Sequence, residues 1–189
     1  GHTGWNKHPA LLLRAMAHPA LRSAFLRRVG APLTSSQRRL VGSLGISERV
    51  RELGYVPAAA LGPIYCASTV LAQPSHFEGF GVTVIEAMAC GTAVIATDVG
   101  GTREMIEHQH NGLLVDFGDE LQLTGAIIKM YSNGRIREIF ARRSREKVER
   151  HLNVKSFIRK IQVVLVETTI AKQVPSVQPS LDAGAYDNK

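Results

Sequence analysis

Short apolar runs alternate with longer segments of helical periodicity along most of this chain, and this alternation constrains the fold more than any other feature. Apolar runs of this kind are typical of parallel strands that are covered on both sides. We therefore predict an α/β fold in which a parallel sheet carries helices on both faces. The expected strands are residues 25–29, 50–56, 69–73, 93–97 and 113–116. The expected helices are residues 9–20, 34–45, 58–68, 82–90, 102–107, 119–131, 135–152 and 154–168.

The length of 189 residues is sufficient for one domain with a full core and a tail. We predict that the domain spans residues 1–168. Residues 169–189, which are rich in Pro, Ser, Gly and Ala toward their end, are expected to form a disordered tail. The first residue is Gly rather than Met, so we expect a fragment or a processed chain.

The net charge of +7 is concentrated in the first quarter of the chain. Residues 1–47 contain no Asp or Glu, whereas the remaining residues hold 16 basic and 16 acidic side chains. Such an excess can attract a diphosphate, an anionic membrane surface or a nucleic acid, although most of these arginines fit an ordinary solvated face. Aromatic residues make up only 6% of the chain and no nucleic-acid motif is evident, so we expect no nucleic-acid partner.

The two cysteines, Cys66 and Cys90, are too few for a disulfide framework and do not have the spacing of metal ligands. They indicate a reducing, cytoplasmic setting. Because each stands beside alanine in an apolar context, we expect buried and unreactive thiols. No apolar run reaches the roughly 18–20 residues needed to span a bilayer, and no apolar targeting segment is present near the start.

A glycine loop between two carboxylates, Glu78 and Glu86, follows the expected strand 69–73 and opens the expected helix 82–90. Gly79 and Gly81 can take positive φ angles and allow close approach of a ligand to the backbone. The first backbone N–H groups of a helix have no intrahelical acceptor, so they favour an anion such as phosphate. The N–H groups expected to bind the anion are those of Val82, Thr83 and Val84.

The two carboxylates indicate that the bound phosphate carries a sugar. Glu86 lies in the second helical turn, and its side chain leans toward the helix start, where it can accept hydrogen bonds from ribose hydroxyls. Glu78 lies across the loop and can reach a sugar on the other side of a diphosphate. Each acid alone is usually a solvated residue or a complement to the helix dipole. The two acids together around a glycine loop favour the binding function.

The spacing of Glu78 and Glu86, within Glu-Gly-Phe-Gly and Glu-Ala-Met-Ala-Cys-Gly, resembles the nucleotide-sugar half of GT-B glycosyltransferases, and family 4 most closely. The resemblance is specific over residues 74–116, including the Gly-Gly turn at residues 100–101. It implies a Rossmann-like domain, the C-terminal half of a GT-B fold. It also implies a set of donor-binding residues: Gly79, Phe80, Gly81, Val82, Thr83, Glu86, Tyr55 and Val56 near the base, and Lys7 and His2 at the diphosphate.

The resemblance further implies transfer of a sugar from a nucleoside-diphosphate sugar with retention at the anomeric carbon. Lys7 and Glu78 are the implied catalytic residues, with Glu78 supporting the transition state rather than acting as a covalent nucleophile. His2 stands where the family commonly has Arg. No metal and no cofactor are expected. The acceptor, a glycan, a lipid or a small molecule, is expected to bind a missing N-terminal domain, with peripheral contact to the inner face of a membrane.

Three alternatives remain open at this point. Gly79, Gly81 and Asp98 partly match a dinucleotide-binding fingerprint, although Val84 occupies the third glycine position. An epimerase or phosphorylase can share the same fold. A chain without its acceptor domain can also bind a nucleotide and catalyse nothing.

Overall fold

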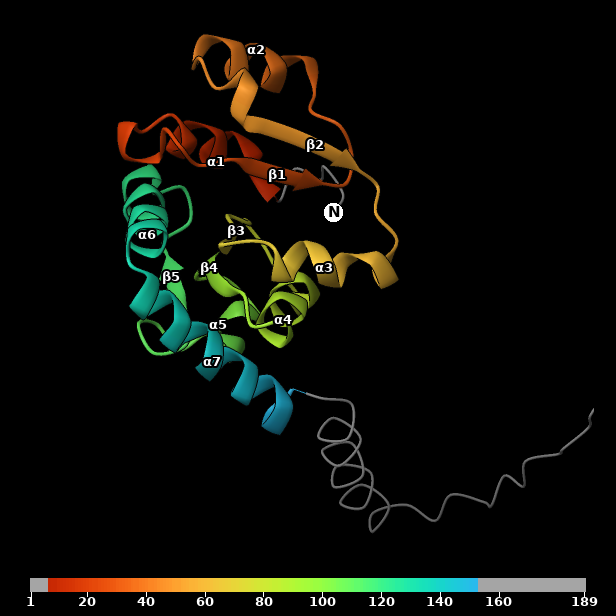
Figure 1. The fold of residues 1–189 in the computed structure, drawn as a ribbon, viewed down its shortest axis with the longest axis vertical. Helices are drawn as coiled ribbons and strands as arrows, with labels where there is room; N and C mark the ends of the chain where they lie inside the picture. Colours follow the sequence, from red (N-terminus) through yellow and green to blue (C-terminus); the bar gives the residue numbers. More distant parts are fainter. Residues whose placement is uncertain (1–6, 153–189) are drawn as a thin grey trace, which may run out of the picture. The chain divides into compact units, whose positions relative to one another are not determined.

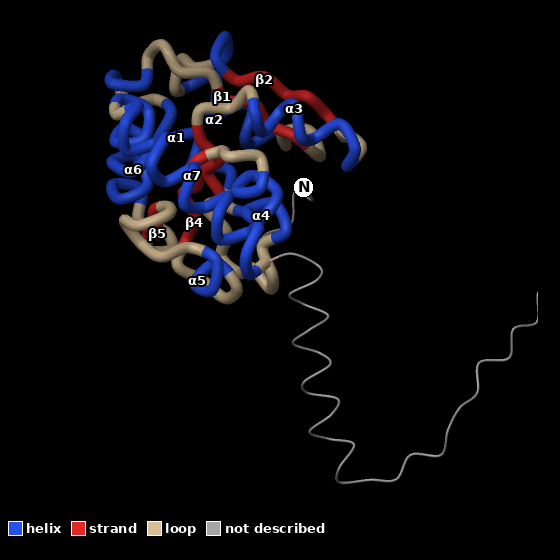
Figure 2. The backbone as a smooth tube through the Cα atoms, turned by 60° about the horizontal axis from the view of Figure 1, so that its bottom comes forward, coloured by secondary structure: helices blue, strands red, loops and turns tan. Residues whose placement is uncertain are grey.

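The computed structural model describes residues 7–152, and within this range the expected alternation of strands and helices is confirmed (Figure 1). Every strand pair between residues 7 and 152 is parallel. Helices lie on both sides of the strands (Figure 2). The predicted helix 154–168, the predicted tail, the domain boundary at residue 168, and His2 all lie outside the described residues.

The strands form two groups rather than one continuous sheet. β1 (Leu26–Val29) pairs with β2 (Val50–Gly54). The other group has the order β3 (Val70–Gln73), β4 (Ala93–Thr97) and β5 (Leu113–Val115). The single parallel sheet that the alternation predicts is therefore divided between β1 and β3.

β4 is buried along its whole length, and its two faces belong to different hydrophobic clusters. Ala93 and Ile95 pack on the side of α1 (Pro9–Met16) and α6 (Glu120–Ser132). Val94 and Ala96 pack on the opposite side, whose helices are α4 (Val82–Ala89), α5 (Thr102–Met105) and α7 (Gly134–His151). This division follows from the two-residue period of a strand, which sends successive side chains to opposite faces.

The helices in the first part of the chain begin where the sequence predicts but end earlier. α1 ends at Met16, and a separate 3-10 turn follows at Pro19–Leu21. The expectation of one helix through residue 20 was wrong because Pro19 has no N–H to donate and disfavours helical geometry in the residue before it. The N-cap of α2 (Ser35–Ser43), which the sequence places at Thr34 or Ser35, is Thr34, in a capping box with Gln37.

The later helices also match the expected segments with small shifts at their ends. α3 is shorter than expected: a 3-10 turn at Ala58–Ala60 precedes it, and the regular helix covers only Leu61–Cys66. Asn133 caps α7 and Asp119 caps α6. Their side-chain oxygens accept hydrogen bonds from the backbone N–H groups of Ile136 and Gln122, respectively. None of the helices described between residues 7 and 152 is long and apolar enough to cross a membrane.

The expectation that both cysteines are buried was wrong. Cys66 is exposed and Cys90 is partly exposed, because each stands at the end of a short helix at the surface rather than in its middle. The Cys66 thiol lies 3.8 Å from the carbonyl oxygen of Cys90. Burial and the neighbouring Cys66 raise the pKa of the Cys90 thiol.

We expect β4 to be the position at which the fold is most sensitive to loss of volume. Ile95→Ala removes a side chain with 0% exposure, and should lower the free energy of unfolding by about 2–5 kcal/mol. Leu121→Ala is the control, because Leu121 is 85% exposed, and should change it by no more than about 0.5 kcal/mol. Urea denaturation followed by circular dichroism measures both. Equal effects of the two substitutions would contradict the central place of β4.

Candidate functional site

The site lies at the carboxyl end of β3 and β4, where the two following loops meet. The Thr97 hydroxyl at the end of β4 donates a hydrogen bond to the carbonyl oxygen of Ser75 in the loop after β3. The Thr102 hydroxyl donates in turn to the carbonyl oxygen of Thr97 at 2.6 Å. All three residues are fully buried. The loops that carry the predicted functional residues are therefore fixed to the ends of the central strands.

The Gly-Gly turn after β4 packs directly against the backbone around Glu78. The N–H of Gly101 donates to the carbonyl oxygen of Glu78 at 2.9 Å. A Cβ atom on Gly101 would lie 2.5 Å from the carbonyl oxygen of Gly79, and one on Gly100 would collide with that of Glu78. Glycine is required at both positions because two backbone segments touch there.

Three donors converge on one oxygen of the Glu78 carboxylate. Lys7 Nζ lies 2.6 Å, Gln73 Nε2 2.5 Å and Ser75 Oγ 3.4 Å from Oε2. The Glu78 side chain is only 15% exposed. Lys7 and Glu78 were each predicted as site residues, and the structure joins them in an ion pair across 71 positions of sequence.

This ion pair changes the electrostatic character of the loop. A half-buried carboxylate beside a helix start would repel an anion that approaches the helix. The Lys7 ammonium compensates that charge within hydrogen-bond distance. An anion can therefore approach the start of α4 without meeting an uncompensated negative charge.

The start of α4 has the geometry of an anion site, with two corrections to the expectation. Gly81 is the N-cap and has a φ of 67°, as predicted, but Gly79 does not take a positive φ. The N–H of Val84 was expected to be available, yet it donates to the carbonyl oxygen of Gly81 at 2.8 Å. Within residues 7–152, the N–H groups of Val82 and Thr83 have no hydrogen-bond acceptor.

Glu86 is oriented by a tyrosine that the sequence pattern did not indicate. The Tyr65 hydroxyl, on α3, donates to Glu86 Oε2 at 2.8 Å. Burial, then the hydrogen bond to Glu86 and its charge, raise the pKa of Tyr65 far above its usual range. The carboxylate of Glu86 keeps acceptor capacity beyond this bond, since a carboxylate can accept about four hydrogen bonds.

The remaining predicted site residues follow the other group of strands or are exposed. Tyr55 and Val56 follow β2, in the two-stranded group, and Tyr55 is 87% exposed. In the described part of the chain, no hydrogen bond joins Tyr55 to Glu78 or Glu86. Phe80, 54% exposed, and Val82, 57% exposed, face solvent beside the start of α4. His2 lies outside the described residues.

Two features at this end of the sheet were not predicted from the sequence. Gln73 is the last residue of β3, and its amide holds Glu78. The second feature is a ring cluster from three different loops: Phe117, beyond β5, lies 4.6 Å from His8 and 4.4 Å from His76 between ring centroids. A polar residue that ends a buried strand was the one available signal for Gln73.

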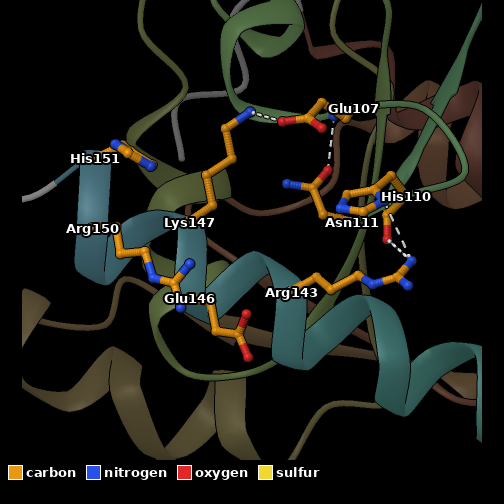
Figure 3. Close-up of a pocket in the computed structure, with 8 residues that line it drawn as sticks. All are labelled: Glu107, His110, Asn111, Arg143, Glu146, Lys147, Arg150 and His151. Atoms are coloured by element: carbon orange, nitrogen blue, oxygen red, sulfur yellow. Dashed lines mark hydrogen bonds and ion pairs between the residues drawn. The ribbon is translucent and has the colours of Figure 1, made fainter.

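A separate hollow of about 190 Å³ lies on α7 (Figure 3). Lys147 pairs with Glu107 at 2.8 Å, and the hydrogen bond and charge of Lys147 lower the pKa of Glu107. Arg143 donates to the carbonyl oxygen of His110 at 3.2 Å. None of the predicted site residues lines this hollow. Within residues 7–152, no group of three or more His, Cys, Asp or Glu side chains is placed to hold a metal ion.

Comparison with known proteins places most of the chain in one family. Residues 1–147 match the model of the family described as glycosyl transferases group 1. A D-inositol 3-phosphate glycosyltransferase of Acidothermus cellulolyticus is 37% identical over 140 residues, which cover 68% of this chain and 31% of that protein. One of Rhodococcus opacus is 42% identical over 120 residues, 58% of this chain and 27% of that protein. The chain spans about a third of the length of the curated relatives it matches.

Solved structures share the fold. HepE of Anabaena in complex with UDP has a TM-score of 0.76 and 26% identity, covering 85% of this chain and 45% of that one. A sucrose-phosphate synthase from Thermosynechococcus elongatus has a TM-score of 0.76 and 29% identity, covering 88% of this chain and 43% of that one. The predicted Rossmann-like half of a GT-B fold is confirmed by these likenesses.

We expect the contact between the Gly-Gly turn and the Glu78 loop to be intolerant of a single methyl group. Gly101→Ala should lower the free energy of unfolding by about 1–3 kcal/mol, because backbone atoms 2.5 Å away must move. Gly125→Ala on α6 is the control, since no atom lies within 4 Å of its Cβ position, and should raise stability by about 0.5–1 kcal/mol. Chemical denaturation measures both. A neutral Gly101→Ala would show that the loops are not in contact.

We expect Tyr65 to resist ionisation. Because the pKa of Tyr65 is raised, the folded protein holds the phenolic proton more tightly than the unfolded chain does. The protonated phenol therefore contributes to the stability of the fold below about pH 10, and this contribution is lost as the pH rises further. A tyrosine that stays protonated adds no tyrosinate absorbance. In a titration up to about pH 11, Tyr65→Phe should therefore gain as much tyrosinate absorbance as the unsubstituted chain. The unsubstituted chain is the control. A lower absorbance in Tyr65→Phe than in the unsubstituted chain would exclude the Tyr65–Glu86 bond.

Proposed function

We propose that this chain, which belongs to the glycosyl transferases group 1 family, binds the donor in a retaining glycosyltransferase of family 4. The observation that carries the proposal is the ion pair between Lys7 and Glu78 beside the Gly81-capped start of α4. Glu86, oriented by Tyr65, lies farther along the same helix. This arrangement supports an anion site at the start of α4, which we propose to lie between the two carboxylates.

The diphosphate of the donor binds at the start of α4. The N–H groups of Val82 and Thr83 and the positive end of the helix dipole meet its oxygens. The Lys7 ammonium is shared between Glu78 and the diphosphate, so the carboxylate does not repel the incoming anion. His2, Gly79 and Phe80 complete the proposed phosphate loop.

The nucleoside binds on the Glu86 side. The Glu86 carboxylate accepts hydrogen bonds from the two ribose hydroxyls, and the Tyr65 hydroxyl holds it in the required orientation. Tyr55 and Val56 lie against the base. HepE, whose structure was solved with UDP, supports a nucleoside diphosphate as the ligand class.

The transferred sugar binds on the Glu78 side. Glu78 accepts hydrogen bonds from sugar hydroxyls and supports the developing positive charge at the anomeric carbon, without forming a covalent bond to it. The leaving diphosphate gains negative charge, and Lys7 and the start of α4 stabilise that charge. Departure and attack on the same face of the sugar give retention. The chemistry needs no metal, since the helix and Lys7 meet the leaving group.

The acceptor is proposed to bind a part of the whole protein that this chain does not include. The chain spans about a third of its curated relatives, so the whole protein's acceptor site is proposed to lie on a second domain. Relatives named D-inositol 3-phosphate glycosyltransferases support a small phosphorylated or polyhydroxylated acceptor. We place the protein in the cytoplasm, with the inner face of the membrane as a site of peripheral contact.

Titration of the 189-residue chain with UDP, GDP, ADP and NAD⁺ by calorimetry tests the donor site. At least one nucleoside diphosphate should bind, and Glu86→Ala should weaken it by about 10- to 100-fold, because a charge-assisted pair of hydrogen bonds is lost. Lys7→Ala should also weaken binding. Glu138→Ala and Lys129→Ala, which change exposed residues on α7 and α6, are the matched controls. Binding of NAD⁺ alone would overturn the proposal.

Steady-state kinetics of the full-length parent test the role of Glu78. Glu78→Ala should lower kcat by about 10²–10³-fold with a smaller change in the KM of the donor, because its contribution is made in the transition state. Glu78→Gln should retain part of the donor affinity. If Glu78→Ala raises only KM, Glu78 is a binding residue and the catalytic assignment is wrong.

A further inference from the structure

The chain's two cysteines, Cys66 and Cys90, lie beside each other at the surface, although 24 positions separate them in the sequence. Cys66 is the last residue of α3, and Cys90 is the C-cap of α4. The two helices pack against each other (Figure 1). The Cys66 Sγ atom lies 3.8 Å from the carbonyl oxygen of Cys90. The packing of two helix ends therefore brings together thiols that the sequence keeps apart.

Both thiols are accessible to small molecules in solution. Cys66 is exposed, Cys90 is partly exposed, and both are free thiols. Oxidation of a thiol depends on access to the sulfur and on its thiolate character, so cysteines buried in a core are inert. This pair has the access that an oxidation site requires, and the proposed function makes no use of either side chain.

The charges around the pair give the two thiols different roles. Burial first, then Cys66 and Glu86, raise the pKa of the Cys90 thiol, and Arg145 of α7 opposes this rise. Cys90 therefore stays protonated at neutral pH. The charge of Arg145 acts on both thiols, and a neighbouring arginine favours a thiolate. Cys66, the more exposed of the two, is the thiol that an oxidant in solution meets first.

The helix that ends at Cys66 is one that a covalent link would anchor. α3 has six residues, and each of them is partly or fully exposed. A helix of this length is marginal by itself, so its position depends on tertiary contacts. The Tyr65 hydroxyl donates to Glu86, and the Thr92 hydroxyl donates to the carbonyl oxygen of Tyr65, both at 2.8 Å. A link at Cys66 would act on the same end of the helix as these contacts.

We propose that Cys66 and Cys90 form a reversible disulfide, which links the end of α3 to the end of α4. A disulfide requires Cα atoms about 4.4–6.8 Å apart and a sulfur–sulfur bond of about 2.05 Å. The Cys66 sulfur already reaches the backbone of Cys90, so rotation of the two side chains toward each other brings the sulfurs together. Both residues stand at a helix end, where the backbone adjusts most easily.

The oxidant is a peroxide or a low-molecular-weight disulfide. With a peroxide, the Cys66 sulfur attacks one oxygen, the O–O bond breaks, and a sulfenic acid and water form. The Cys90 sulfur then attacks the Cys66 sulfur, the S–O bond breaks, and the hydroxyl group leaves with the Cys90 proton as a second water. Each sulfur loses one electron, and the peroxide gains two. A low-molecular-weight disulfide gives the same product by two thiol exchanges and is reduced to two thiols, and the reverse exchanges restore the dithiol.

The disulfide would hold Tyr65 against Glu86. Cys66 directly follows Tyr65, and the N–H of Cys90 donates to the carbonyl oxygen of Glu86 at 3.1 Å. The linked cysteines therefore lie beside both members of the Tyr65–Glu86 pair. The importance of that pair for a nucleoside rests on the proposed function. The disulfide itself rests on the positions of the two cysteines, and it is tested without any nucleotide.

Equilibration of the 189-residue chain with reduced and oxidised glutathione tests the disulfide. The folded monomer should lose both thiols and two hydrogen atoms of mass, and peptide mapping should join Cys66 to Cys90. At a fixed glutathione ratio, the ratio of disulfide to dithiol should be at least about tenfold higher in buffer than in urea, because the fold holds the thiols together. Cys66→Ser and Cys90→Ser are the matched controls, and neither should show the mass loss or the joined peptides.

Hydrogen exchange measures the anchoring of α3. The N–H groups of Ala67 and Ser68 donate to the carbonyl oxygens of Pro63 and Tyr65, at the end of the helix that the disulfide would fix. Exchange at these two amides should be at least about tenfold slower in the disulfide form than in the dithiol form. Exchange in α2, a helix from another part of the chain, should be the same in both forms.

A ratio of disulfide to dithiol that is equal in buffer and in urea would overturn the proposal. Disulfides that join only two copies of the chain would also overturn it. A monomeric disulfide that leaves exchange at Ala67 and Ser68 unchanged would overturn the anchoring of α3.

Discussion

The burial of β4 on both faces is the constraint on which the rest of the structure depends. Its alternate side chains belong to two hydrophobic clusters, so the helices on both sides are positioned by one strand. The strand gains stability from apolar contact on each face, and any displacement of it would disturb both clusters. β3 and β5 pair with its two edges, and their carboxyl ends are consequently aligned with its own.

The chemistry of the site follows from that alignment. The Thr97 hydroxyl, at the end of β4, donates a hydrogen bond to the loop after β3. The Gly-Gly turn that follows β4 contacts the backbone of Glu78. The acids of the motif are therefore presented by loops with few alternative positions. Lys7 approaches from the first part of the chain and compensates the charge of Glu78, so a rigid acidic loop can still face an anionic ligand. Preorganised polar groups of this kind stabilise developing charge with little reorganisation.

Local patterns in the sequence were sufficient to predict the strands, most helix starts and the Glu78–Glu86 motif. Thr34 and Gly81 were predictable because a cap and a left-handed residue depend on immediate neighbours. The partners of the two acids were not predictable in the same way. Lys7 and Tyr65 are distant in sequence from the carboxylates they contact, and only the packed sheet brings them together. The division of the sheet was likewise not predictable. The alternation of strands and helices along the sequence indicates which elements follow one another, but it does not indicate which strand edges remain unpaired.

The close backbone contact between Gly100–Gly101 and Glu78–Gly79 has a mechanical consequence. Two segments that touch without intervening side chains have no compressible layer between them, so they translate together. A change that displaced the Gly-Gly turn would therefore displace the Glu78 loop as well. The position of the Glu78 carboxylate consequently depends on a turn that follows a different strand, β4.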